Sequence, residues 1–288
     1  MIKLEDIITA LVKFDHGNES IGEVVLGRCS TDVDGIIFLK PELTAIPPDK
    51  LHLALIHFES LLRQYEVKIQ GTYIISGQFI LYKNIFSENY KHIQQYTYYE
   101  LTRNEISHAK LAKTMREHKD CEAALGGVTL VQRGFTPEFV LDLWSNSGKV
   151  IKIDDDLYGV PCLLKGQKIL LLNGFYPAQL DQYNVPNSKI ILFPFRTKTS
   201  FVLLKKCFQG SAEPDNRYPQ SMRQHLYDKR YDYQLNSLSP SRNGIHLSND
   251  REEGRREAKL FLDAIESYFE KGTVQNGNLR YRGCSWMF

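Results

Sequence analysis

The segment from Asp250 to about Lys271 is the feature that most narrows what this chain can fold into. Its apolar residues recur at steps of three and four, which predicts a helix with one buried face and one charged face. These apolar residues are Ala258, Phe261, Leu262, Ile265, Tyr268 and Phe269. Ser248 or Asn249 can cap the first turn, and Asn249 with Glu252 has the spacing of a capping box. The apolar face of this helix needs an apolar surface to pack against, so the pattern predicts a packed domain.

One histidine, His246, lies in the short turn before this helix. The amide groups and the dipole at a helix start favour a nearby anion such as a phosphoryl group. Neutral imidazole is also a good nucleophile near pH 7. A single histidine beside a helix start is more often only a polar loop residue, so the prediction of a catalytic histidine depends on other residues of the chain.

Other segments carry residues suited to phosphate, in a recognisable order. They are 35–42 (Gly-Ile-Ile-Phe-Leu-Lys-Pro-Glu), 210–214 (Gly-Ser-Ala-Glu-Pro) followed by Pro219 and Arg223, and 243–248 (Asn-Gly-Ile-His-Leu-Ser). These segments resemble the nucleoside diphosphate kinases, whose active-site motif runs Asn-x-x-His-Gly-Ser-Asp. Glu257 also falls at the family's spacing from His246 (257 − 246 = 11).

The resemblance implies a kinase that moves the γ-phosphate of a nucleoside triphosphate to a nucleoside diphosphate through a phosphohistidine on His246. Glu257 is implied to orient the imidazole, and Lys40 to reach the phosphates. The other implied nucleotide- or phosphate-binding residues are Tyr90, Phe175, Lys206, Arg223, Asn243 and Ser248. Phe175 is the expected stacking partner of the base, and Ser248 is expected to be a cap first and a ligand second. Mg²⁺ is implied by the triphosphate and would be held mainly by the phosphates, so no dedicated protein metal site is expected.

The chain departs from the family pattern at several positions. Lys206, Ala212, Leu247 and Asn249 replace an arginine, a threonine, a glycine and an aspartate. Lysine keeps a positive charge but loses the bidentate guanidinium. Two alternatives therefore stay open: the same chemistry on a modified or non-nucleoside acceptor, and a nucleotide-binding scaffold without turnover. A third alternative, nucleic-acid binding through residues 223–233, depends only on their basic residues and tyrosines.

The order of expected elements predicts an α+β fold. Expected strands are 35–40, 67–76, 190–195 and one within 230–237, and expected helices are 48–65, 78–91, 175–184 and 200–209. This order favours a ferredoxin-like antiparallel sheet (βαββαβ) with covering helices.

We expect residues 1–33 to be an N-terminal extension with a short helix and a possible strand at 22–26. Residues 34–288 would form the kinase-like domain, interrupted by an inserted subdomain at about 93–172. That insert is expected to contain helices at 105–119 and 137–144, and strands at 150–153, 158–164 and 168–172.

Composition limits the cellular setting. The 36 basic residues are balanced by 34 acidic ones, which gives a net charge of +2, so nucleic acid is not expected as a partner. No apolar run of eighteen residues is present and the N-terminus is acidic, so we expect a cytoplasmic protein without membrane contact. Five widely spaced cysteines predict reduced thiols rather than disulfides or a zinc site. The resemblance favours a homo-oligomer.

Overall fold

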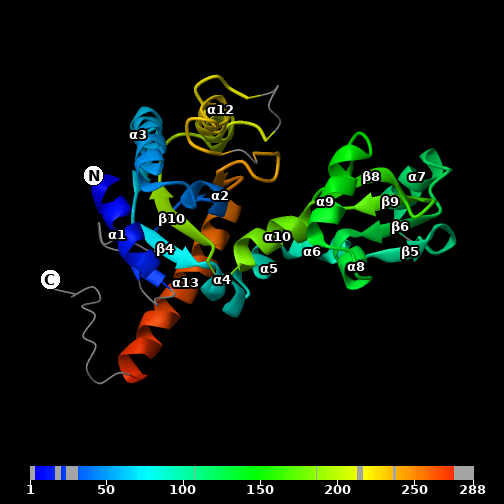
Figure 1. The fold of residues 1–288 in the computed structure, drawn as a ribbon, viewed down its shortest axis with the longest axis horizontal. Coiled ribbons are helices and arrows are strands. Elements are labelled where there is room, and N and C mark those ends of the chain that lie inside the picture. Colours follow the sequence, from blue (N-terminus) through cyan, green and yellow to red (C-terminus); the bar gives the residue numbers. More distant parts are fainter. Residues whose placement is uncertain are drawn as a thin grey trace. The chain divides into compact units, whose positions relative to one another are not determined.

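The computed structural model describes residues 4–16, 21–23, 32–106, 108–185, 187–212, 217–235 and 238–275. It has an α+β fold with two sheets, each in a compact unit of its own (Figure 1). The first unit combines Met1–Ile85 with Val185–Phe288, and the second is Phe86–Asn184. Within the described ranges, no helix has the length and apolar character that a membrane span requires.

The sheet of the first unit is antiparallel at every pairing. Its strands are β1 (Ile21–Glu23), β2 (Gly35–Leu39), β3 (Lys68–Ile69), β4 (Tyr73–Ser76), β10 (Lys189–Arg196) and β11 (Ile245–Leu247). They lie in the order β1-β4-β10-β2-β11, with β3 pairing β10 beside β4. The central strands β2 and β10 therefore each have a paired strand on both edges, and β2 is buried along its whole length.

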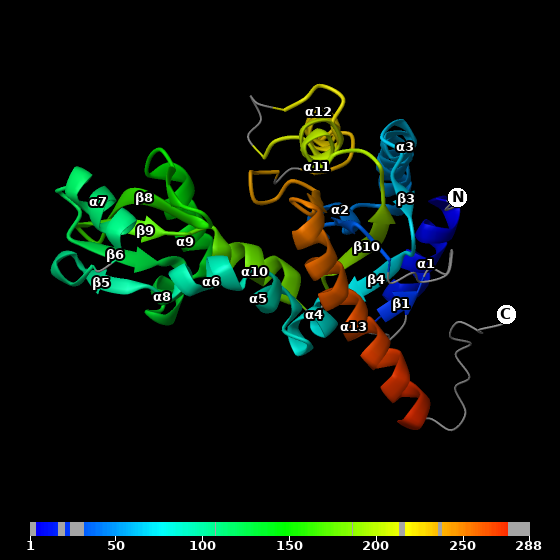
Figure 2. The ribbon, with the colours of Figure 1, turned by 180° about the vertical axis from the view of Figure 1, so that it is seen from behind.

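Helices cover both faces of this sheet. They are α1 (Leu4–His16), α2 (Pro41–Thr44), α3 (Pro48–Gln64), α4 (Gly77–Tyr82), α11 (Phe201–Leu203), the π-helical turn η2 (Leu204–Gln209), α12 (Met222–Asp228) and α13 (Arg251–Gln275). Ile37 and Leu39 of β2 join one core with Phe58 of α3. Phe38 points to the opposite face, where its ring meets Phe261 of α13. Figure 2 shows α13 crossing that face.

The second unit has a mixed sheet in the order β5-β6-β9-β8-β7, in which only β6 and β9 are parallel among the described pairs. The strands are β5 (Glu100–Thr102), β6 (Ala123–Gly126), β7 (Ile151–Asp154), β8 (Leu157–Leu164) and β9 (Gln167–Leu172). The helices are α5 (Ile85–Asn89), α6 (Lys91–Thr97), η1 (Arg103–Glu105), α7 (Ala109–Glu117), α8 (Gly127–Gln132), α9 (Pro137–Asn146) and α10 (Tyr176–Asn184). One face of the sheet packs on α8 and α9, and the other packs on α7.

The elements confirm much of the sequence prediction and correct part of it. The strand expected within 230–237 is wrong for 230–235, because 230–234 form turns and 235 has no regular structure, while 236–237 lie outside the described residues. The strand is instead β11, which contains His246. The helix expected at 78–91 is interrupted because Asn84 has a positive φ of 54°. The possible strand at 22–26 is described only as far as Glu23 in β1.

A candidate active site around His246

His246 lies at the centre of β11, opposite Phe38 of β2. Side chains alternate along a strand, so Ile245 and Leu247 enter the core under α3 while His246 faces α13. The imidazole stacks on the Phe38 ring with centroids 4.4 Å apart and planes 14° apart. Only 13% of the His246 side chain is exposed. The sheet thus holds the ring in one orientation.

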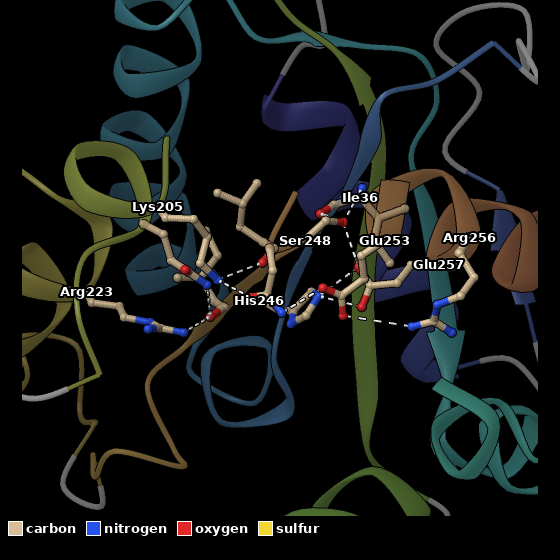
Figure 3. Close-up of polar contacts among 12 residues, drawn as sticks. Ile36, Lys205, Arg223, His246, Ser248, Glu253, Arg256 and Glu257 are labelled. Carbon is tan, nitrogen blue, oxygen red and sulfur yellow. Dashed lines mark hydrogen bonds and ion pairs between the residues drawn. The ribbon is translucent and has the colours of Figure 1, made fainter. Parts of the chain in front are cut away.

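A buried carboxylate holds one nitrogen of this ring. Nε2 of His246 lies 3.2 Å from Oε2 of Glu257 on α13. Glu257 is fully buried, and Ser248 donates its hydroxyl to the same Oε2 at 2.6 Å (Figure 3). The Ser248 hydroxyl also accepts a hydrogen bond from the backbone N–H of Ile36 at 3.0 Å. The carboxylate is therefore fixed by a serine that β2 positions.

The start of α13 differs from the prediction. Oδ1 of Asp250 accepts from the backbone N–H of Glu253 at 2.8 Å, so Asp250 caps the helix. The expected cap at Ser248 or Asn249 is wrong, because Ser248 is directed at Glu257. Asn249 instead donates its amide to Glu253 and accepts from Lys205. The residue expected to be a cap thus supports the carboxylate behind His246.

Cationic side chains lie on the other side of His246 from Glu257 (Figure 3). Lys205 donates to the carbonyl of Leu247 at 3.1 Å and to Oδ1 of Asn249 at 2.9 Å. Arg223 of α12 donates to the carbonyls of Gly210 at 3.0 Å and Ile245 at 3.1 Å. Both cations therefore contact the backbone of the strand that contains the histidine.

Lys40 is a third cation near His246, and we call Lys40, Lys205 and Arg223 the cationic cluster. Lys40 follows β2 directly and is only 4% exposed. Its Nζ donates to the carbonyl of Ser241 at 2.9 Å. A buried ammonium group with one such partner keeps further donors for an anion. A phosphate that enters the cluster would replace the carbonyl with a better acceptor.

The structure places Lys205, and not the predicted Lys206, in the cluster. Lys206 is exposed, whereas Lys205 reaches Leu247 and Asn249. Both residues belong to η2, whose hydrogen bonds span five residues instead of four. The wider turn changes which side chains of this segment face β11 relative to an α-helix, and the resemblance that selected Lys206 carries no information on this.

Burial and like charge control the protonation of the cluster. Burial lowers the pKa of Lys40 to about 8, and Arg223 and Lys205 add repulsion, while Glu42 opposes the shift. Burial, followed by Arg223, lowers the pKa of Lys205 to about 8. Burial also lowers the pKa of His246 below its ordinary value, against the attraction of Glu257. Near pH 7 the imidazole is thus neutral and both lysines are largely charged.

Asn243 lies in the turn that leads into β11. It is buried, and its amide donates to the carbonyl of Pro240 at 2.6 Å. Its Oδ1 is buried and has no hydrogen-bond partner among the described residues. Gly244, with φ of 79°, follows it, donates its N–H to Glu42 and accepts from the N–H of Lys40. The turn that contains Asn243 is therefore hydrogen-bonded to the backbone of Lys40.

The remaining predicted site residues lie elsewhere or are not described. Tyr90 and Phe175 belong to the second unit, where Tyr90 stacks on Phe86 and Phe175 packs against Trp144 and Tyr158. Their nucleotide contacts stay predictions. In the glycine loop, residues 213–216, which include Pro214, lie outside the described residues.

No group of three or more histidine, cysteine, aspartate or glutamate side chains is arranged to hold a metal ion in the part of the chain that the structure describes. The cluster near His246 is cationic, so it suits polyphosphate oxygens rather than a bare cation. No protein-family model matches the chain, and no curated protein matches it.

Proposed function

We propose that the protein is a phosphotransferase of the nucleoside diphosphate kinase type, with His246 as the residue that carries the phosphoryl group. The observation that supports this most is the position of the imidazole, between the buried carboxylate of Glu257 and the cations Lys205 and Arg223 (Figure 3). A carboxylate on one ring nitrogen fixes the tautomer, and cations on the other side offset phosphate charge.

In this proposal each ring nitrogen has its own role. A proton on Nε2 would be donated to Glu257, whose Oε2 lies 3.2 Å away, and the lone pair of Nδ1 would then be the nucleophile. Nδ1 attacks the γ-phosphorus of the triphosphate, a P–N bond forms, and the bond to the bridging oxygen breaks, releasing the diphosphate. In the second half-reaction the terminal oxygen of an acceptor diphosphate attacks the same phosphorus, the P–N bond breaks, and the imidazole returns to its neutral form.

The surrounding cations stabilise the charge of this transfer. Lys40, Lys205 and Arg223 would bind the γ-phosphate and bridging oxygens as charge moves to the leaving group. Mg²⁺ bound to the phosphates would offset their remaining negative charge. Glu257 stabilises the positive charge that the ring gains in the phosphohistidine.

The proposal includes the ferredoxin-like arrangement for the first unit. Along its sheet the last core strand, β11, lies beside the first, β2, and the third, β10, lies between β2 and the second, β4. Helix α3 connects β2 to β3 and β4, and η2 with α12 lies between β10 and β11. This order and the antiparallel pairings support a split βαββαβ unit.

A specialised acceptor is the second candidate, and the altered residues favour it. Asn249, where the family has aspartate, binds Lys205 directly. A neutral amide leaves the positive charge of this lysine less compensated than a carboxylate would. The same cluster could therefore hold a phosphate acceptor other than an ordinary nucleoside diphosphate.

A two-stage radiolabel experiment tests the proposal. The protein is first incubated with γ-labelled ATP and Mg²⁺, separated from nucleotide, and then mixed with a panel of nucleoside and non-nucleoside diphosphates. We expect label on the wild type that discharges within the mixing time onto at least one diphosphate, and none on His246→Ala. Equal labelling of the His246 variant would end the proposal, and tight nucleotide binding without label would identify a scaffold.

A further inference from the structure

Four planar side chains form a stack between the glycine loop and the C-terminal end of α12. In order they are Arg217, Tyr227, Arg230 and Tyr231. The Arg217 guanidinium lies 4.9 Å from the Tyr227 ring centroid, and the Arg230 guanidinium lies 4.3 Å from Tyr227 and 4.4 Å from Tyr231. We call these four residues the Arg-Tyr stack.

Hydrogen bonds hold the two arginines of the stack in place. Arg217 donates to the carbonyls of Ser211 and Ala212, and Arg230 donates to the carbonyl of Tyr227 at 2.7 Å. The outermost ring, Tyr231, is 70% exposed although one of its faces lies against Arg230. An ordered aromatic ring with an exposed surface is a preformed stacking platform, because its side-chain freedom is already reduced.

The Arg-Tyr stack is connected to the cationic cluster through α12. Arg223 and Tyr227 are four positions apart on this helix, so they lie on one face about 6 Å apart along the axis. Arg223 binds the carbonyl of Gly210, and Arg217 binds the next two carbonyls of the same loop. A ligand with phosphates at Arg223 would extend its remaining part towards the stack.

We propose that the nucleobase of the nucleotide substrate stacks on Tyr231, while its phosphates lie at Lys40, Lys205 and Arg223. This inference rests on the proposed function for the position of the phosphates. A purine or pyrimidine on a polyphosphate combines the two features that the surface recognises, a flat π-face and negative charge. Phe175, the residue that the resemblance implies for base stacking, is partly buried and packs against the core of the second unit. Tyr231 supplies a base contact within the first unit.

Calorimetric titrations with ATP and with tripolyphosphate, both with Mg²⁺, separate base binding from phosphate binding. We expect Tyr231→Ala to weaken ATP binding about tenfold, which is the size of one base-stacking contact, and to leave tripolyphosphate binding unchanged. Tyr231→Phe should retain the wild-type affinity for ATP. The matched control is Tyr82→Ala, because Tyr82 is also exposed and lies beside a lysine, Lys83, at 5.7 Å.

The inference is overturned if Tyr231→Ala binds ATP like the wild type, or if it loses affinity for both ligands equally. Tighter binding of a single-stranded oligonucleotide than of ATP would also overturn it, since the surface would then serve nucleic acid. Labelling with γ-labelled ATP separates this result from the proposed function. An unlabelled wild type with Tyr231-dependent ATP binding rejects only the phosphotransferase, and a labelled wild type with unchanged ATP affinity in Tyr231→Ala rejects only the base site.

Discussion

Individual side chains around His246 show which parts of the site a sequence can predict. His246 and Glu257 were both predicted from the resemblance to the kinase motif, and the structure brings their side chains together from β11 and α13. The role of Ser248 as a partner of Glu257 was missed, because it depends on how β11 pairs with β2. A hydroxyl near a helix start is equally compatible with capping, and only the pairing of the strands decides between the two.

Glu257→Gln should slow formation of the phosphohistidine by about one to two orders of magnitude. The amide keeps the size of the carboxylate but removes the charge that raises the pKa of His246 and stabilises the ring after transfer. Single-turnover labelling measures the rate, and ¹⁵N NMR of the imidazole should report a pKa below that of the wild type. Glu266→Gln, at an exposed position of α13, is the control. An unchanged labelling rate in Glu257→Gln would show that the carboxylate has no catalytic role.

Anion affinity should fall as pH rises through about 8. Lys40 and Lys205 each have a pKa of about 8, so both are mainly protonated at pH 7 and mainly neutral at pH 9. Binding of an anion favours the protonated forms, so tripolyphosphate should bind with proton uptake near pH 8 and roughly tenfold more weakly at pH 9.5 than at pH 7. Titration calorimetry in buffers of different ionisation enthalpy measures both. Constant affinity across this pH range would show that Lys40 and Lys205 do not bind the anion.

Among the elements, those with a clear apolar pattern were predicted, including the five-residue strand β2, and the three-residue strand β11 was not. Helix α3 and strand β10 carry enough apolar residues to define a period. Strand β11 has only three residues, too few for an alternating pattern, so the fourth strand was expected within 230–237. The segment that forms the π-helical turn η2 contains apolar and basic residues that do not distinguish a π-helical turn from an α-helix. In this turn Lys205, and not Lys206, contacts β11.

The placement of Lys205 and Lys206 in η2 predicts that replacing them has very different effects on anion affinity. Lys205→Ala should weaken tripolyphosphate binding by about tenfold or more, because it removes a largely buried charge beside His246. Lys206→Ala should change the affinity less than twofold, because this side chain is exposed. Parallel titrations of both variants provide the measurement, with each as the control of the other. A larger loss of affinity in Lys206→Ala than in Lys205→Ala would contradict this placement and show that Lys206 binds the anion.

The two units differ in how their organisation could be foreseen. The helix at 137–144 and the strands at 158–164 and 168–172 were predicted and correspond to α9, β8 and β9. Strand β6, the parallel neighbour of β9, was missed, because its small residues Ala123, Ala124 and Gly126 lack the β-branched and aromatic pattern of a strand. The second unit nevertheless has its own sheet, with apolar clusters on both faces.

Residues 86–184 should therefore fold as an isolated fragment. Each face of its sheet is covered by helices of the same unit, so the fragment buries its own core and should unfold cooperatively with a free energy of about 5–15 kcal/mol. Circular dichroism during urea titration gives this value. Leu171→Ala, which truncates a buried core residue, should lower it by about 2–5 kcal/mol. A fragment that lacks a cooperative transition would show that the unit depends on the rest of the chain.

The most direct test of the phosphohistidine is to locate the phosphoryl group on the protein after a single turnover with ATP. Peptide mass spectrometry under alkaline conditions identifies the residue, and two-dimensional ³¹P NMR distinguishes phosphorylation at Nδ1 from that at Nε2. We predict one adduct, at Nδ1 of His246, because Glu257 engages Nε2. An adduct at Nε2, an adduct on another residue, or the absence of any adduct under conditions that saturate the protein with ATP would contradict the proposed mechanism.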